Sequence, residues 1–265
     1  MDASARLTTL TRLGFAARGM LYIVIAFLVI RSGRTEDPAG ALDYLAEGSG
    51  RMLVMVMAAG FIGYGIWRLS DATFNIENHS PDGKGLRERL GAAASGVVHL
   101  ALAWQAIRLI RGAGSAGEGG AEEGARTALT IPGGQLALVL VGIGLIGVGV
   151  FQMVKAARAR FLNKLEPQVA GQAWAKWTGR LGYAARGLVF LICGFFLLRA
   201  GLDAKASKAG GFEDALSWLS NPWDVIIAAG LLCFGIFSLI QARFRILHDV
   251  PVEGIASGAV TPTLS

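Results

Sequence analysis

The sequence predicts an all-α fold: an integral membrane six-helix bundle built from three parallel two-helix repeats, with short interfacial helices between the paired helices. The first observation is composition, because 53% of the 265 residues are hydrophobic and only 17% are charged, against roughly 25% in an average soluble domain. Second, the apolar residues form long blocks without the alternation of barrel strands. Third, the chain carries an internal repeat. Composition alone excludes a disordered chain and disfavours a soluble domain.

Six apolar blocks approach the roughly 20 residues that a membrane-spanning helix needs. They are Leu13–Ile30, Met52–Leu69, Leu90–Ile107, Gln135–Val154, Leu181–Leu198 and Trp223–Ile240. We expect the first block to be a retained helix and not a cleaved signal peptide, because Arg12 and Arg18 interrupt the N-terminal segment. The 37 glycines lie mostly in or beside the blocks, which predicts closely packed helices.

The placement of lysine and arginine predicts the orientation of these helices. The side that holds both termini and the second and fourth loops carries 16 of the 25 basic residues, and the opposite side carries 9. Cytoplasmic loops are enriched in basic residues, so both termini are expected in the cytoplasm. A basic inner face would attract anionic lipids, which accounts for the net charge of +6 without a nucleic-acid partner.

An internal repeat organises the whole chain. The segment RLGFAARG at 12–19 returns as RLGYAARG at 180–187, and the second helices match between 58–67 and 228–237. A degenerate middle copy begins RLGAAASG at 89–96. Each unit is therefore a helix pair, and three pairs in the same orientation suggest a pseudo-threefold axis along the membrane normal.

These repeats divide the chain into unit 1 (7–78), a degenerate unit 2 (86–162), unit 3 (175–249) and a flexible cytoplasmic tail (250–265). The three tandem helix pairs, with their RLG(F/Y)AARG starts, resemble the bacterial membrane family called Domain of Unknown Function 1206. The resemblance covers roughly residues 7–249. It implies a multi-pass protein of the bacterial cytoplasmic membrane, and it brings no activity, catalytic residue or ligand.

Short helices are expected at the outer face, between the paired helices. The segments Ala41–Leu45 and Ala215–Leu219 echo each other, and Tyr44 and Trp218 suit the aromatic belt at the membrane interface. The corresponding part of unit 2, Gly112–Gly124, is expected to be a glycine-rich acidic loop.

Arg18 and Arg186 are the most informative charged residues. Each is followed by 12 uncharged residues, which rise only about 18 Å as a helix, so each arginine must enter the inner leaflet. They either contact an anion or substrate, or bond to helix-end carbonyls or to Asp71, and we favour the structural interpretation. Our hypothesis is that Arg18 pairs with Asp71. Ser95 replaces the arginine in unit 2.

His99 is the one histidine at membrane depth. It could be a proton relay, a metal ligand or a haem ligand, but a membrane haem usually has two axial ligands, and His79 and His248 lie at the inner surface. We favour a neutral imidazole that is hydrogen-bonded across helices, aided by Ser95. The sequence thus predicts no metal and no cofactor.

Other motifs favour packing over chemistry. GIGLIG at 142–147 matches a dinucleotide fingerprint, but it lies inside an apolar helix with no strand before it. Cys193 and Cys233 also lie inside apolar blocks. A membrane enzyme or redox protein would need paired histidines, cysteines or carboxylates, which the blocks lack.

The sequence therefore predicts a non-enzymatic structural or regulatory membrane bundle with no catalytic residues. The alternative is a small transporter or channel, with a path between the repeats near His99, Arg18 and Arg186. The predicted partners are the lipid bilayer and anionic lipids at the cytoplasmic face. Protein partners and homo-oligomerisation stay open.

Overall fold

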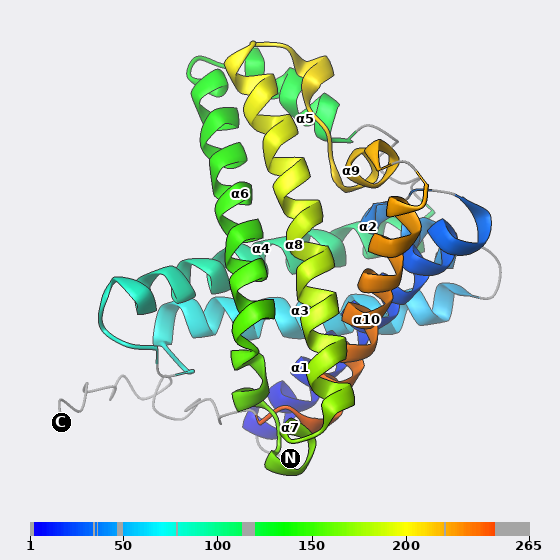
Figure 1. Ribbon diagram of the computed structural model, residues 1–265, viewed down its shortest axis with the longest axis vertical. Helices are drawn as coiled ribbons and strands as arrows, with labels where there is room; N and C mark the ends of the chain where they lie inside the picture. Colours follow the sequence, from blue (N-terminus) through cyan, green and yellow to red (C-terminus); the bar gives the residue numbers. More distant parts are fainter. Residues whose placement is uncertain are drawn as a thin grey trace.

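The computed structural model describes residues 3–33, 35, 37–46, 50–77, 79–112, 120–219 and 221–246. Six long helices make up most of this part (Figure 1): α1 (Ala3–Phe27), α3 (Arg51–Phe74), α4 (Gly83–Ile110), α6 (Gly134–Arg158), α8 (Ala173–Leu202) and α10 (Trp223–Phe244). Each contains a segment that is long and apolar enough to cross a membrane. The predicted all-α membrane bundle is confirmed, and no strand occurs among the described residues.

Short helices follow the first long helix of each unit. In unit 1, a π-helical turn, η1 (Leu28–Ser32), leads to α2 (Pro38–Ala46). In unit 3, a short turn, η4 (Ala206–Lys208), leads to α9 (Phe212–Trp218). The two interfacial helices expected from the sequence are therefore present, and Trp218 is well exposed, at 65%.

Unit 2 departs from the expected loop. A helix, α5 (Gly120–Leu129), begins inside the segment Gly112–Gly124, so the loop prediction is wrong over 120–124. Residues 113–119 lie outside the described part. The helix is favoured because two glutamates occupy its first turn, where the helix dipole stabilises negative charge, and because Arg126 pairs with Glu122 one turn earlier.

Two short elements fill the inner linker between α6 and α8. They are η3 (Arg160–Lys164) and α7 (Pro167–Ala170). Leu165 forms an isolated antiparallel bridge with Arg245 at the end of α10. This bridge brings the linker against the last residues of unit 3, beside the inner ends of the long helices.

The six long helices pack as a row in the order α4, α3, α1, α10, α8, α6. The first helices of units 2 and 3 each pack against the second helix of the preceding unit, and α1 packs against α10, the second helix of unit 3. In Figure 1, α6 and α8 stand upright in front of α3 and α4, which run across the view, and α10 lies to the right of α8. α1 is the most enclosed of the six long helices, because 67% of its most apolar 18-residue segment is buried, against 22% of the same kind of segment in α6.

The same close glycine contact occurs at all three junctions between units. At each one, a Cβ added to one glycine would lie 3.0 Å or less from the carbonyl oxygen of the glycine it faces. The contacts are Gly19 with Gly235, Gly96 with Gly65, and Gly149 with Gly187. Small residues let membrane helices approach this closely, so the glycines of the repeat define the junctions between units.

The first arginine of each repeat also has one shared role. Arg89 donates to the carbonyls of Ala72 (2.7 Å) and Thr73 (3.0 Å) at the end of α3. Arg180 does the same at the end of α6, and Arg12 at the end of α10. The last carbonyls of a helix lack partners within it, and cations there are favoured by the helix dipole. Each arginine thus caps the preceding unit.

The two helices of unit 2, α4 and α6, do not form a packed pair. In unit 1, a Cβ added to Gly60 would lie 2.8 Å from the carbonyl oxygen of Leu13. In unit 2, Gly91, Gly144 and Gly147 have nothing within 4 Å of such an atom. The row of helices is therefore open between α4 and α6.

Candidate functional site

The polar side chains at membrane depth gather near the middle of the row. We call this group the central cluster, and it consists of Arg18, Tyr22, Tyr64, His99, Arg186 and Phe234. Its members come from α1, α3, α4, α8 and α10. A second group, the inner-end network, lies at the cytoplasmic ends predicted from the sequence, and it consists of Arg68, Asp71, Glu77, His79, Glu88, Lys164 and Arg245.

Arg18 holds three helices together at the central cluster. Its Nε donates to the Ser238 hydroxyl at 3.2 Å, one terminal nitrogen to the Tyr64 hydroxyl at 3.0 Å, and the other to the Gln241 side-chain oxygen at 2.8 Å. The side chain is only 6% exposed. All three acceptors are neutral, so the positive charge is hydrogen-bonded but not compensated.

The hypothesis that Arg18 pairs with Asp71 is therefore wrong. In the antiparallel pair of α1 and α3, Gly14 lies against Gly60, so Asp71, further along α3, is level with the start of α1. Arg18 instead lies at the contact between α1 and α10, because the next residue, Gly19, packs against the carbonyl of Gly235. Two of its three partners, Ser238 and Gln241, therefore come from unit 3, and the third, Tyr64, comes from α3 of unit 1.

The partner of Arg186 could not be predicted from the sequence. In the structure, the neighbours of its guanidinium group are aromatic rings. The guanidinium carbon lies 4.8 Å from the ring centre of Phe234, 4.9 Å from Phe190 and 5.6 Å from Tyr22. Its Nε is buried and has no hydrogen-bond partner among the described residues. Cation–π contacts of this kind contribute about 0.5–2 kcal/mol each, and they leave the charge without a counterion.

His99 is 3% exposed and is hydrogen-bonded within its own helix. Its Nδ1 lies 2.7 Å from the backbone oxygen of Ser95, so Nδ1 is the protonated nitrogen. The ring packs against Tyr64 of α3, with ring centres 4.4 Å apart. Ser95 thus contributes its carbonyl, and contact with the neighbouring helix is aromatic and not a hydrogen bond.

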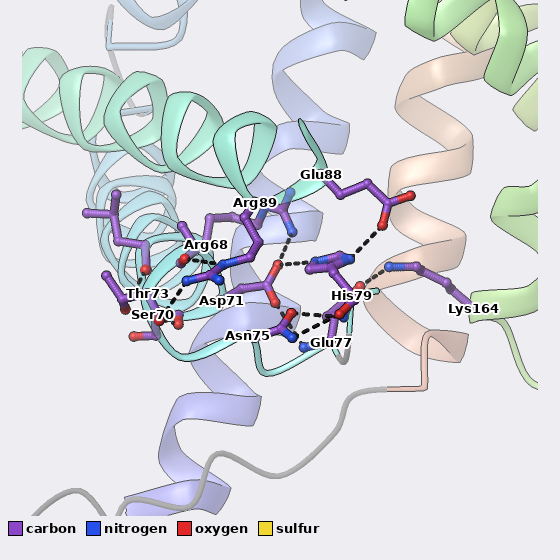
Figure 2. Close-up of polar contacts among 12 residues, drawn as sticks. Arg68, Ser70, Asp71, Thr73, Asn75, Glu77, His79, Glu88, Arg89 and Lys164 are labelled. Carbon is purple, nitrogen blue, oxygen red and sulfur yellow. Dashed lines mark hydrogen bonds and ion pairs between the residues drawn. The ribbon is translucent and has the colours of Figure 1, made fainter. Parts of the chain in front are cut away.

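The inner-end network is built around Asp71, whose side chain is fully buried. One carboxylate oxygen accepts from Arg68 at 3.0 Å and faces His79 Nε2 at 3.1 Å, and the other accepts from the backbone of Glu77 at 2.9 Å. His79 also contacts Glu88 at 2.8 Å through Nδ1. Figure 2 shows this chain of contacts from the end of α3 to the start of α4.

Glu77 connects this network to unit 3 and to the inner linker. Its carboxylate forms ion pairs with Lys164 of η3 and with Arg245 at the end of α10. Burial lowers the pKa of Arg245, so the adjacent carboxylate offsets part of the penalty for taking this charge out of water. Through Glu77, unit 1 meets both the linker between α6 and α8 and the end of unit 3.

Three residues of the network could be considered as a metal site. Ligand atoms of Asp71, Glu77 and His79 lie within 4.8 Å of one another. Both carboxylates, however, are already paired with arginine or lysine side chains. A cation would have to displace those partners, so the donor set fits an ion-pair network better than a metal centre.

Sequence reasoning missed several members of both groups. Tyr64, Gln241, Glu77 and Arg245 were not singled out, because each lies in a helix or loop whose spatial neighbours are far away in the chain. One available signal was the repeat: Tyr64 lies against Gly14 and Phe234 lies against Gly182, which are equivalent glycines of units 1 and 3.

Six helices that are long and apolar enough to span a membrane, two from each of three repeated units, are typical of a multi-pass α-helical membrane protein. A family model described as Domain of Unknown Function (DUF1206) matches residues 13–75, 90–159 and 181–245, one segment in each unit, and the chain belongs to this family. The chain is also similar to the uncharacterized protein YxxB of Bacillus subtilis (strain 168), with 30% identity over 249 residues, 88% of this chain and 90% of the relative. No solved structure matches the chain.

Proposed function

We propose that this protein is a non-enzymatic structural or regulatory bundle of the bacterial cytoplasmic membrane. The observation that carries the proposal is the use of its buried polar groups. Arg18 binds groups on two other helices, and Asp71 accepts from Arg68 and from the Glu77 backbone. Catalytic groups have to be free to reach a substrate, whereas Arg18 joins three helices and Asp71 holds the end of α3 against the loop that follows it.

We also propose that both termini lie in the cytoplasm and that the basic inner face binds anionic lipids. The excess of lysine and arginine on that side supports both statements. Exposed arginines such as Arg158 and Arg160 lie at this end of the helices. Binding of the purified protein to vesicles of phosphatidylcholine with phosphatidylglycerol, compared with phosphatidylcholine alone, tests the lipid preference.

The replacement His99→Phe tests the non-enzymatic proposal. Phe190 occupies the equivalent position in unit 3, so phenylalanine is a residue that the repeat accommodates. We expect the variant to accumulate in the membrane and to restore the phenotype of a deletion strain as the wild type does. A variant that accumulates normally but fails to restore the phenotype would assign His99 a chemical role and contradict the proposal.

Transport is the second candidate, and one observation favours it. α4 and α6 do not pack together, and α6 is the one long helix that contributes no residue to the central cluster. A transporter would use this opening as part of its path, with His99 exposed to water along it. In that case His99→Phe would change the flux of an anion or proton into vesicles that contain the purified protein, whereas a structural bundle gives no flux with either residue.

A further inference from the structure

Two arginines of different units share one aromatic side chain. The guanidinium carbons of Arg18 and Arg186 lie 5.2 Å and 4.8 Å from the ring centre of Phe234. Their guanidinium carbons therefore lie at most about 10 Å apart. Both side chains are charged at any physiological pH, and like charges at such a separation repel each other more strongly in an apolar interior than in water.

No carboxylate among the described residues forms an ion pair with either arginine. The nearest network of acidic groups, at the inner ends of the helices, is already paired with Arg68, Lys164 and Arg245. The hydrogen bonds of Arg18 go to neutral groups, and the contacts of Arg186 go to aromatic rings. An uncompensated pair of cations inside a membrane protein therefore calls for an anion from outside the chain.

Both arginines have donors available for such an anion. Arg18 makes one hydrogen bond from each nitrogen, which leaves a second N–H on each terminal nitrogen. In Arg186, the Nε is buried and unpartnered among the described residues. The planar fork of a guanidinium matches the spacing of two oxygens on a phosphate or carboxylate, so the chemistry suits an oxyanion.

The position of the two side chains allows an anion to enter. Arg186 is half-buried, in contrast to the buried Arg18, and the row of helices is open between α4 and α6. Each arginine is followed by 12 uncharged residues before the next charge, Arg31 or Arg199. That distance, about 18 Å along a helix, places both arginines in the inner half of the membrane, nearest the cytoplasmic head groups.

We propose that Arg18 and Arg186 form a binding site for one phosphate-class oxyanion, either free phosphate or the phosphate of an anionic lipid head group. The anion neutralises both guanidinium groups and joins unit 1 to unit 3. The site goes beyond the structural role proposed above, because it gives the bundle a ligand whose presence stabilises the contact between the first and last units.

Thermal unfolding of the full chain tests the site with two probes. The first probe is inorganic phosphate, added at constant ionic strength to protein in a neutral detergent. The second is the lipid, with nanodiscs of phosphatidylcholine alone compared with nanodiscs that also contain phosphatidylglycerol. A ligand that binds only the folded state raises the Tm, and the increase grows with the ratio of ligand concentration to Kd. Stabilisation by phosphate identifies a free anion, and stabilisation by phosphatidylglycerol identifies a lipid head group.

Arg186→Gln is the decisive variant, because Arg186 has no hydrogen bond to lose among the described residues. We expect Arg186→Gln to weaken the affinity for the stabilising ligand at least tenfold, since a charge-assisted hydrogen bond is roughly twice as strong as a neutral one. Arg158→Gln, an exposed arginine at the inner end of α6, is the matched control and should respond as the wild type does. The proposal is overturned if neither probe stabilises the wild type, or if Arg186→Gln and the wild type respond equally.

Discussion

Single residues show how charge is accommodated in these helices. Arg18 keeps its charge at membrane depth by donating to three neutral oxygens on two other helices. Asp71, in contrast, is buried among groups that donate to it at the end of α3. The two residues were expected to pair because they begin and end the same unit. They do not pair because α1 places Arg18 against α10.

A double-mutant cycle tests this assignment at the residue scale. Arg18→Met combined with Gln241→Leu should lose less stability than the sum of the single changes, with a coupling of about 1 kcal/mol. The control cycle combines Arg18→Met with Asp71→Asn, which should be additive within about 0.5 kcal/mol. Unfolding of the purified variants in detergent measures both. Coupling to Asp71 and not to Gln241 would contradict the structure.

At the scale of helices, one sequence motif has two functions. The first arginine of each repeat caps the second helix of another unit, and the last glycine lets the same two helices cross closely. Both contacts occur three times, so the three junctions between units are built in the same way. Within a unit the contact is less uniform, because α1 packs against α3 while α4 and α6 stay apart.

Matched glycine replacements test that difference. Gly60 and Gly144 are equivalent positions in α3 and α6, but only Gly60 has backbone within 3 Å of an added Cβ. Gly60→Leu should cost about 1–3 kcal/mol through overpacking, whereas Gly144→Leu should leave unfolding of the purified protein unchanged. Equal losses would show that the free face of α6 is covered in the membrane, by α4 or by another chain.

The start of α4 gives a prediction for pH. The side chain of Asp82 accepts from the backbone of Lys84 and Gly85 as a helix cap, and the Ser80 hydroxyl followed by the Gly85 N–H lowers its pKa from 3.8. Because the pKa of Asp82 is lower in the folded state than in the unfolded chain, its carboxylate stabilises the fold at pH values above the unfolded-state pKa. This contribution is lost as the pH falls through the folded-state pKa.

Asp82→Ala should therefore lower the Tm at pH 7, and the gap to the wild type should narrow below about pH 3.8, where the contribution of the carboxylate charge is lost. Asp82→Asn keeps an oxygen acceptor for the cap, so it should retain most of the stability at both pH values. Unfolding curves across this range measure the gap. A gap that persists unchanged at low pH would show that the carboxylate charge has no part in the cap.

For the molecule as a whole, the sequence was sufficient to predict where the long helices lie, but not which helices pack against one another. Each of the six apolar blocks coincides with a long helix, because length and composition decide whether a segment can span a membrane. The repeat also predicted three units. The contact of α1 with α10 could not be predicted, because nothing local distinguishes it from the contact with α3. The opening in unit 2 was equally hidden, since Gly144 and Gly147 keep the pattern of packed glycines.

The central claim is that the six segments cross the membrane as three pairs in the same orientation. Cysteine accessibility tests it most directly, in a chain whose two native cysteines are replaced by alanine. Single cysteines are introduced at exposed positions between the long helices: Ser80 and Gln168 on the proposed cytoplasmic side, and Thr130 and Lys205 on the opposite side. Spheroplasts are then treated with a maleimide that cannot cross the membrane.

The account predicts that Thr130→Cys and Lys205→Cys are labelled in intact spheroplasts. Ser80→Cys and Gln168→Cys should react only after the membrane is permeabilised, because both lie between long helices on the proposed cytoplasmic side. Labelling of Ser80→Cys or Gln168→Cys in intact spheroplasts would contradict the shared orientation of the three pairs.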